Sequence, residues 1–204
     1  AGLSGHSFDF AEVQDGLSEF ARACVYDRGG YGWSDNIPGP RTSLDIVEEM
    51  HTLIHSVPEL KPPIILVGAS FGGQNVRLYA SKYPEDIEAL ILIDSLNTDK
   101  LDYEGYKDRA GKSGLPWHFH ALNATHWLGA QRLFIGMMFK GDDPEMERRR
   151  QMLGRSKTTT TIYRELAGPR LSSGRESMRH LGDIPVLIFS AGDRTKVQVT
   201  NSDH

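Results

Sequence analysis

The sequence predicts an α/β protein with a mostly parallel, doubly wound sheet and an inserted helical segment. Short apolar runs rich in β-branched residues alternate with amphipathic segments of helical period, as in parallel βαβ units with right-handed crossovers. Between residues 97 and 181 the apolar periodicity is helical, and no convincing strand interrupts it. We therefore expect a sheet core in residues 1–96 and 182–204 and a helical cap in residues 97–181.

The first part of the chain supplies a short helix, a strand candidate and a longer helix. Apolar residues recur at helical spacing from Phe8 to Leu17, and the apolar run Ala21–Tyr26 is expected to be a strand. Thr42 with Asp45 three residues later is a capping-box signature that begins a helix, and Pro58 ends this helix. These elements lead into the next buried strand.

The segment Pro63–Tyr83 carries the motif on which the functional interpretation depends. A β-branched run, too short for a helix, is followed by an amphipathic segment with helical spacing. Ser70 stands at the joint, with Gly68 and Gly72 two residues away on either side, which is the G-x-S-x-G nucleophile elbow. Glycine fits there because a Cβ would collide with neighbouring backbone, and the Phe71 amide would point at a reacting carbonyl. The glycine patterns of phosphate-binding loops do not fit.

Two further strands complete the predicted sheet. They are the apolar runs Ala89–Asp94 and Ile184–Phe189, and the second is followed by a turn that contains Asp193. The sequence as a whole resembles the α/β-hydrolase fold superfamily, in its lipase- and esterase-like branch with a helical cap. The resemblance covers nearly the whole chain and rests on four stretches: Gly68–Gly73, Tyr26–Asp35, Ile93–Ser95 and Pro185–Asp193.

The resemblance implies roles for four residues. Ser70 falls at the position of the nucleophile, and Asp193 falls at the acid that orients the catalytic histidine. The opening Ala1–Leu3 is similar to the His-Gly-x motif of this superfamily, whose third residue donates a backbone N–H to the oxyanion hole. Leu3 and Phe71 would then be the two donors. Ala1 replaces the usual histidine, which matters little because the donor is a backbone group. Asp94 is the alternative acid, since some members place theirs after the earlier strand.

The catalytic histidine has no matching position in these residues. The order in this superfamily is serine, acid, histidine, and a further helix and strand of roughly 11 and 5 residues precede the histidine. His204 follows Asp193 too closely to fit, and His6 is the least implausible substitute, although a turn residue is the better interpretation. The remaining histidines also precede the acid: His51, His55, His118, His120, His126 and His180.

The opening of the chain departs from the superfamily pattern as well. The strand that precedes the oxyanion motif in the superfamily is not present before Ala1, and without it two interior strand edges would lie unpaired. We therefore expect these residues to be a fragment of a longer hydrolase, and residues 1–204 alone to be inactive. The cellular location is not determined by these residues; a cytoplasmic protein is our expectation.

Composition excludes several other classes. The formal net charge is −4, and Arg148–Arg150 is interleaved with acidic residues, so we expect no nucleic-acid partner. No apolar run approaches the length of a membrane span. No Cys/His cluster has metal-ligand spacing, so we expect neither metal nor cofactor. The single cysteine, Cys24, lies in an apolar run and is expected to be a buried structural thiol. The oligomeric state is open.

The leading functional hypothesis is a serine hydrolase that cleaves a small carboxylic ester or a related acyl substrate. The same triad could serve an aminopeptidase or a carbon–carbon bond hydrolase. A hypothesis from another class is a ligand-binding or signalling protein on a hydrolase scaffold, without useful turnover. Dehalogenases and epoxide hydrolases with an aspartate nucleophile are disfavoured because a serine, Ser70, occupies the elbow. Fold alone does not decide among these functions.

Overall fold

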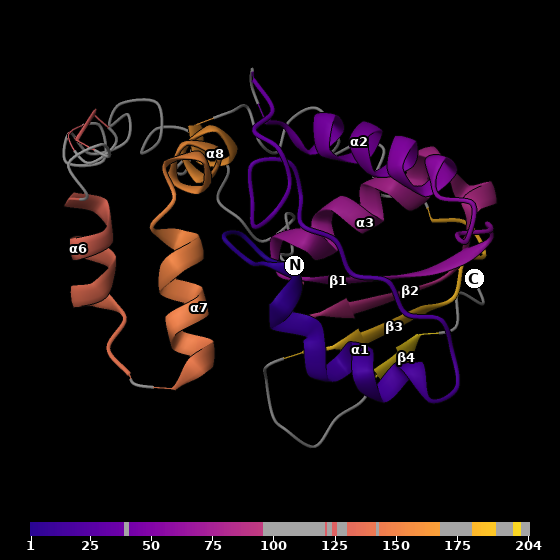
Figure 1. Ribbon diagram of the computed structural model, residues 1–204. Coiled ribbons are helices and arrows are strands. Elements are labelled where there is room, and N and C mark those ends of the chain that lie inside the picture. Colours follow the sequence, from indigo (N-terminus) through magenta and orange to yellow (C-terminus); the bar gives the residue numbers. More distant parts are fainter. Residues whose placement is uncertain are drawn as a thin grey trace. The chain divides into compact units, whose positions relative to one another are not determined.

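The computed structural model describes residues 1–38, 41–95, 121, 124–125, 130–141, 143–167, 181–190 and 198–200 (Figure 1). Contacts divide the chain into two units. The first consists of Ala1–Leu3, Arg41–Tyr103 and Pro169–His204, and the second of Ser4–Pro40 and Glu104–Gly168. The division into a core and a cap at residues 96/97 and 181/182 stays a prediction, and each unit is described separately below.

The first unit contains a four-stranded sheet. Its strands, in order across the sheet, are β1 (Ile64–Ala69), β2 (Ile87–Ile93), β3 (Val186–Phe189) and β4 (Gln198–Thr200). The strand β2 is parallel to both of its neighbours, β1 and β3, whereas β4 is antiparallel to β3. The predicted α/β class with a mostly parallel sheet is therefore confirmed. The short β4 was not predicted, because three residues are too few to show a period-two pattern.

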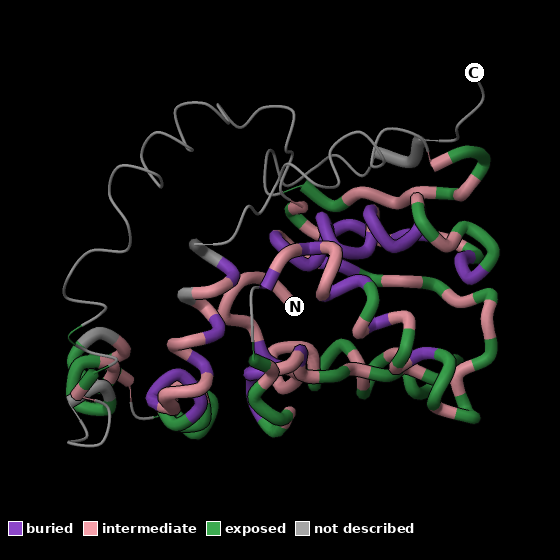
Figure 2. The backbone as a smooth tube through the Cα atoms, turned by 90° about the horizontal axis from the view of Figure 1, so that it is seen from above, coloured by how far each residue is buried: buried purple, intermediate pink, exposed green. Residues whose placement is uncertain are grey.

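Two helices of this unit, α2 (Ser43–Ser56) and α3 (Phe71–Lys82), lie on the same face of the sheet (Figure 1). The predicted capping box begins α2, since the Asp45 amide donates to Thr42 Oγ1 at 3.2 Å and the Thr42 amide donates to Asp45 Oδ2 at 2.8 Å. A short helix η2 (Pro84–Asp86) leads from α3 into β2. Buried residues are purple in Figure 2, and those of the core cluster are Val47, Met50, Ile54, Val76, Leu78, Tyr79, Ala80, Ile87, Leu90 and Leu92.

Three sequence-based expectations were wrong in detail. The strand β1 was expected to be fully buried, but Ile65 and Val67 are 52% and 37% exposed, because α2 and α3 both cover the opposite face. The run Ala21–Tyr26 is not a strand, since no other described segment forms a ladder with it. Cys24 lies in this run and is exposed rather than buried. An apolar run indicates burial only when a neighbouring segment covers it.

The second unit begins with η1 (Ser7–Phe10) and α1 (Ala11–Ser18), as the helical spacing predicted. The helices α6 (Ala130–Met138), α7 (Pro144–Leu153) and α8 (Ser156–Ala167) confirm that the described part of the 97–181 segment is helical. In α7, Arg149 pairs with Glu145 and Arg150 with Glu147, so this basic run is balanced by carboxylates of the same helix. Within the described ranges, no helix has the length and hydropathy needed to cross a bilayer.

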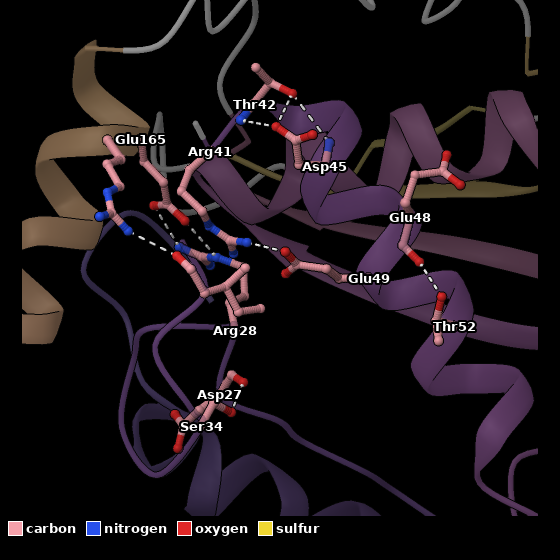
Figure 3. A network of polar contacts seen from close by, with 12 residues as sticks. Asp27, Arg28, Ser34, Arg41, Thr42, Asp45, Glu48, Glu49, Thr52 and Glu165 are labelled. Carbon is pink, nitrogen blue, oxygen red and sulfur yellow. Dashed lines mark hydrogen bonds and ion pairs between the residues drawn. The ribbon is translucent and has the colours of Figure 1, made fainter. Parts of the chain in front are cut away.

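A buried ion pair joins the glycine-rich loop of residues 27–35 to α8. The Arg28 guanidinium donates to both carboxylate oxygens of Glu165, with Nη2 at 3.1 Å from Oε2, and the Tyr31 hydroxyl donates to the same Oε2 at 2.6 Å. The side chains of Arg28 and Glu165 are 6% and 0% exposed, and Figure 3 shows them facing each other. Burial opposes the charged form of Arg28, but the Glu165 carboxylate outweighs it and raises the pKa of the guanidinium. These bonds fix the loop.

Candidate active site

Ser70 alone forms the joint between β1 and α3. Its backbone has φ 49° and ψ −119°, a conformation that favours glycine and costs a serine about 1–3 kcal/mol. Two backbone hydrogen bonds hold the turn: the Ser70 amide donates to the carbonyl oxygen of Ile93 at 3.0 Å, and the Gly73 amide donates to the carbonyl oxygen of Ser70 at 3.0 Å. The residue is half-buried, and its hydroxyl does not cap α3. The strained turn thus presents a hydroxyl that is not used for capping.

Three glycines allow the chain to approach itself closely around this turn. A Cβ on Gly68 would lie 2.6 Å from the carbonyl oxygen of Gly72 and 2.7 Å from the Cα of Gly73. A Cβ on Gly72 would overlap the carbonyl oxygen of Ala1, and one on Gly73 would overlap the Ser95 side chain. The collision with backbone that the motif predicted is therefore present at both flanking positions, Gly68 and Gly72. Gly73 is a third position of this kind.

Replacing Gly68 with alanine is expected to destabilise the fold by about 1–3 kcal/mol or more, because the new Cβ meets backbone that cannot rotate away. Gly16→Ala is the matched control, since Gly16 lies within α1 with no atom within 4 Å of its would-be Cβ. In a helix this control should be neutral or stabilise by roughly 0.5–1 kcal/mol. Urea unfolding followed by circular dichroism measures both, and equal effects of the two substitutions would contradict the steric argument.

The segment Ala1–Leu3 passes beside the elbow. A Cβ built on Gly2 would lie 3.4 Å from Ser70 Cβ and 3.8 Å from Ser70 Oγ, which is ordinary van der Waals contact. Gly2 therefore runs alongside the serine side chain, and Leu3 is the next residue. Phe71 is the first residue of α3, where the helix dipole favours negative charge. The two segments that would supply backbone donors to an oxyanion thus both adjoin Ser70.

The acid of the predicted triad is not placed by these observations. Asp193 lies outside the described residues. The alternative, Asp94, directly follows β2, is exposed, and has a φ of 43°. Its amide donates to the carbonyl oxygen of Phe189 at 2.7 Å, so the end of β2 is held to the end of β3. The choice between Asp193 and Asp94 stays a prediction.

The histidines divide into three groups. His118, His120, His126, His180 and His204 lie outside the described residues. His6 belongs to the second unit, is 1% exposed, and stacks on Phe8 with ring centroids 5.2 Å apart. Burial lowers the pKa of His6 against the opposing attraction of Asp27 and Asp9.

His51 and His55 form the third group, on α2, and sequence reasoning missed their partner. Both Nε2 atoms approach Oδ2 of Asp86 in η2, at 3.8 Å and 2.9 Å. Burial would raise the pKa of Asp86, but hydrogen bonds from Tyr79 and His55 outweigh it and lower that pKa. The i, i+4 spacing of the histidines was the available signal. Asp86 precedes β2 whereas the Ser70 amide bonds Ile93 at the other end of this strand, so the cluster is not part of the elbow site.

Comparison with known proteins gives the family. The family model of the alpha/beta hydrolase fold matches residues 1–195. An uncharacterized protein of Schizosaccharomyces pombe is 29% identical over 197 residues, covering 91% of this chain and 34% of that protein. The crystal structure of a hydrolase from Pseudomonas aeruginosa is similar with a TM-score of 0.62 and 18% identity, covering 93% of this chain and 68% of the other.

A thermophilic esterase from Thermogutta terrifontis is similar with a TM-score of 0.54 and 20% identity, over 90% of this chain and 66% of that one. At such identities the solved structures show a shared fold only. The chain spans about a third of the length of the Schizosaccharomyces pombe relative. The family model matches residues 1–195, and the mostly parallel sheet with a strained serine between strand and helix agrees with it: this chain belongs to the alpha/beta hydrolase fold family.

Proposed function

We propose that this chain is the core of a serine hydrolase that cleaves a small carboxylic ester or related acyl substrate, with Ser70 as the nucleophile. The observation that carries the proposal is the Ser70 backbone, at φ 49° and ψ −119° between β1 and α3. Such strain persists only where the surrounding structure imposes it, and it clusters at active sites. The Ala1–Leu3 segment alongside the Ser70 side chain adds a second support.

The reaction would be acyl transfer to water. A histidine removes the proton from Ser70 Oγ, which attacks the ester carbonyl carbon, while the backbone amides of Leu3 and Phe71 donate to the oxyanion. The tetrahedral intermediate expels the alcohol, which takes the proton from the imidazolium. Water then attacks the acyl-serine by the same route and releases the acid. Asp193 would hold the imidazole in the required tautomer and stabilise its charged form.

The histidine is proposed to follow Asp193, in agreement with the serine, acid, histidine order. No histidine in residues 1–204 fits this position, as argued from the sequence. We therefore propose that residues 1–204 alone turn over little or no ester. The proposal that the substrate is an ester rests on the names of two structural neighbours, a hydrolase and an esterase, which share the fold at low identity.

A serine-directed phosphonate tests the proposal. In the longest natural polypeptide that contains this chain, we expect rapid covalent labelling of one serine, identified as Ser70 by peptide mass spectrometry. Residues 1–204 should label slowly, because no base activates the hydroxyl. Labelling of a different serine, or of none in that natural polypeptide, would refute Ser70 as the nucleophile and favour a ligand-binding role. Rapid labelling in residues 1–204 would show that a base is already present.

A further inference from the structure

Two imidazoles and a carboxylate converge on one point of the first unit. His51 and His55 are four residues apart on α2, so their side chains leave the same face of the helix. Each offers Nε2 to Oδ2 of Asp86, and the ligand atoms of the three residues lie within 4.8 Å of one another. The two rings are close, with centroids 4.3 Å apart.

Only one of the two histidines is hydrogen-bonded to Asp86. His55 Nε2 is within hydrogen-bond distance of Asp86 Oδ2, at 2.9 Å, whereas His51 Nε2 is 3.8 Å from the same oxygen, too far for a hydrogen bond. His51 is nevertheless held in this orientation, since its ring stacks on Tyr83 with centroids 3.9 Å apart. The Tyr79 hydroxyl donates to Asp86 Oδ2 at 2.6 Å and fixes the carboxylate. The ligand atoms are therefore oriented before any ion binds.

Zn²⁺ fits this donor set. Neutral imidazole nitrogen and carboxylate oxygen are common zinc ligands, and tetrahedral bonds of about 2.0–2.1 Å place ligand atoms roughly 3.3 Å apart. The distances from Asp86 Oδ2 to Nε2 of His55 and of His51, 2.9 and 3.8 Å, lie on either side of that value. Asp86 is 6% exposed, whereas His51 and His55 are 33% and 45% exposed, so a fourth position could hold water. Lys82, the last residue of α3, is paired with Glu48.

We propose that His51, His55 and Asp86 bind one Zn²⁺ ion. The ion would tie α2 to η2, which directly precedes β2, and so clamp the helix layer to the sheet. The segment His51–His55 reads His-Thr-Leu-Ile-His and lacks the glutamate that acts as general base in zinc proteases. We therefore propose no protease activity for this site, only the link between α2 and η2, and the sequence prediction of no metal would be wrong.

This site is separate from the elbow. Asp86 lies just before the first residue of β2, and the Ser70 amide bonds the last residue of that strand, Ile93. Seven residues of strand separate the two ends by on the order of 20 Å. The zinc proposal is thus independent of the acyl-transfer proposal, and either can fail alone.

The test uses the untagged chain with Cys24→Ser, which removes the single exposed thiol that could bind metal. Isothermal titration with Zn²⁺ is expected to show one ion per chain. At about a hundred times Kd the melting temperature should rise by roughly 5–10 °C. His51→Gln and His55→Gln should each weaken binding by about 10-fold or more. Glu88→Gln is the matched control, since it removes an exposed carboxylate of β2, two residues from Asp86 and outside the ligand set, and it should keep the affinity.

Co²⁺ supplies a second readout that stability alone does not change. The chain with Co²⁺ should show the visible absorption of a four-coordinate site, and His51→Gln should abolish it while the far-ultraviolet circular dichroism stays that of a folded chain. His51 makes no hydrogen bond to Asp86, so this variant is expected to fold. Absence of stoichiometric binding, or equal zinc affinity in the parent and His51→Gln, would overturn the proposal.

Discussion

Replacing Ser70 with alanine should remove ester turnover, with kcat/KM falling by about 10⁴-fold or more in the longest natural polypeptide that contains the chain. The reason is chemical, because alanine has no oxygen to form the acyl intermediate. Hydrolysis of short p-nitrophenyl esters measures the loss. Ser56→Ala is the control, since Ser56 is an exposed serine at the end of α2, and its replacement should leave kcat/KM unchanged.

The same position offers a check on the strain argument. Ser70→Gly should be as inactive as Ser70→Ala, yet more stable, because glycine adopts a φ of 49° without the cost that a Cβ brings. A gain of roughly 1 kcal/mol in the free energy of unfolding relative to Ser70→Ala is expected. Retention of more than a tenth of the turnover in either variant would exclude Ser70 as the nucleophile.

Replacing Glu165 with alanine is expected to destabilise the protein by about 3–5 kcal/mol, since it leaves the Arg28 guanidinium buried without its counter-charge. The Tyr31 hydroxyl loses its acceptor in the same variant. Urea unfolding with circular dichroism measures the change. The control is Glu145→Ala, which removes an exposed partner of Arg149 on α7 and should change the free energy of unfolding by less than about 1 kcal/mol.

A double variant distinguishes the cause of this loss. If the penalty comes from an uncompensated buried charge, Arg28→Met combined with Glu165→Leu should be much less destabilising than Glu165→Ala alone. If the double variant loses as much stability as the single one, the contribution of Glu165 is packing and not charge. A Glu165→Ala change below 1 kcal/mol would contradict the buried ion pair itself.

Local signals in the sequence predicted the elements well wherever the physical cause is local. The capping box of Thr42 and Asp45 marks the start of α2 because both hydrogen bonds are made within four residues. Gly68 is needed because the backbone of Gly72 and Gly73, four and five residues away, would otherwise collide with its Cβ. The three strands β1, β2 and β3 were recognised from apolar runs whose lengths suit a sheet.

Features that depend on partners distant in the sequence could not be predicted from local signals. The run Ala21–Tyr26 has strand composition, but a strand also needs a neighbour with which to exchange hydrogen bonds. Arg28 and Glu165 are 137 positions apart, and neither shows in the sequence that it will be buried with the other. The position of Asp86 beside His51 follows from the packing of α2 against α3, which leads through η2 into β2, and periodicity does not specify this packing.

In the candidate site, too, the local part was predictable from the sequence and the part that depends on distant residues was not. Ser70 and its glycines form one continuous stretch, so the motif predicted their local geometry. The acid and the histidine come from separate parts of the chain. Their assignment rests on the order of the residues along the sequence, which is a weaker argument than geometry. Asp193 therefore stays a prediction, whereas the conformation of Ser70 is a structural finding.

The exposure of Cys24 has a practical consequence. The chain has a single thiol, and it is exposed, so a maleimide dye would attach to the second unit at one defined position without any engineering. A second cysteine introduced on the sheet unit would accept the matching fluorophore. Energy transfer between the two dyes would then report the distance between the two labelled positions in solution.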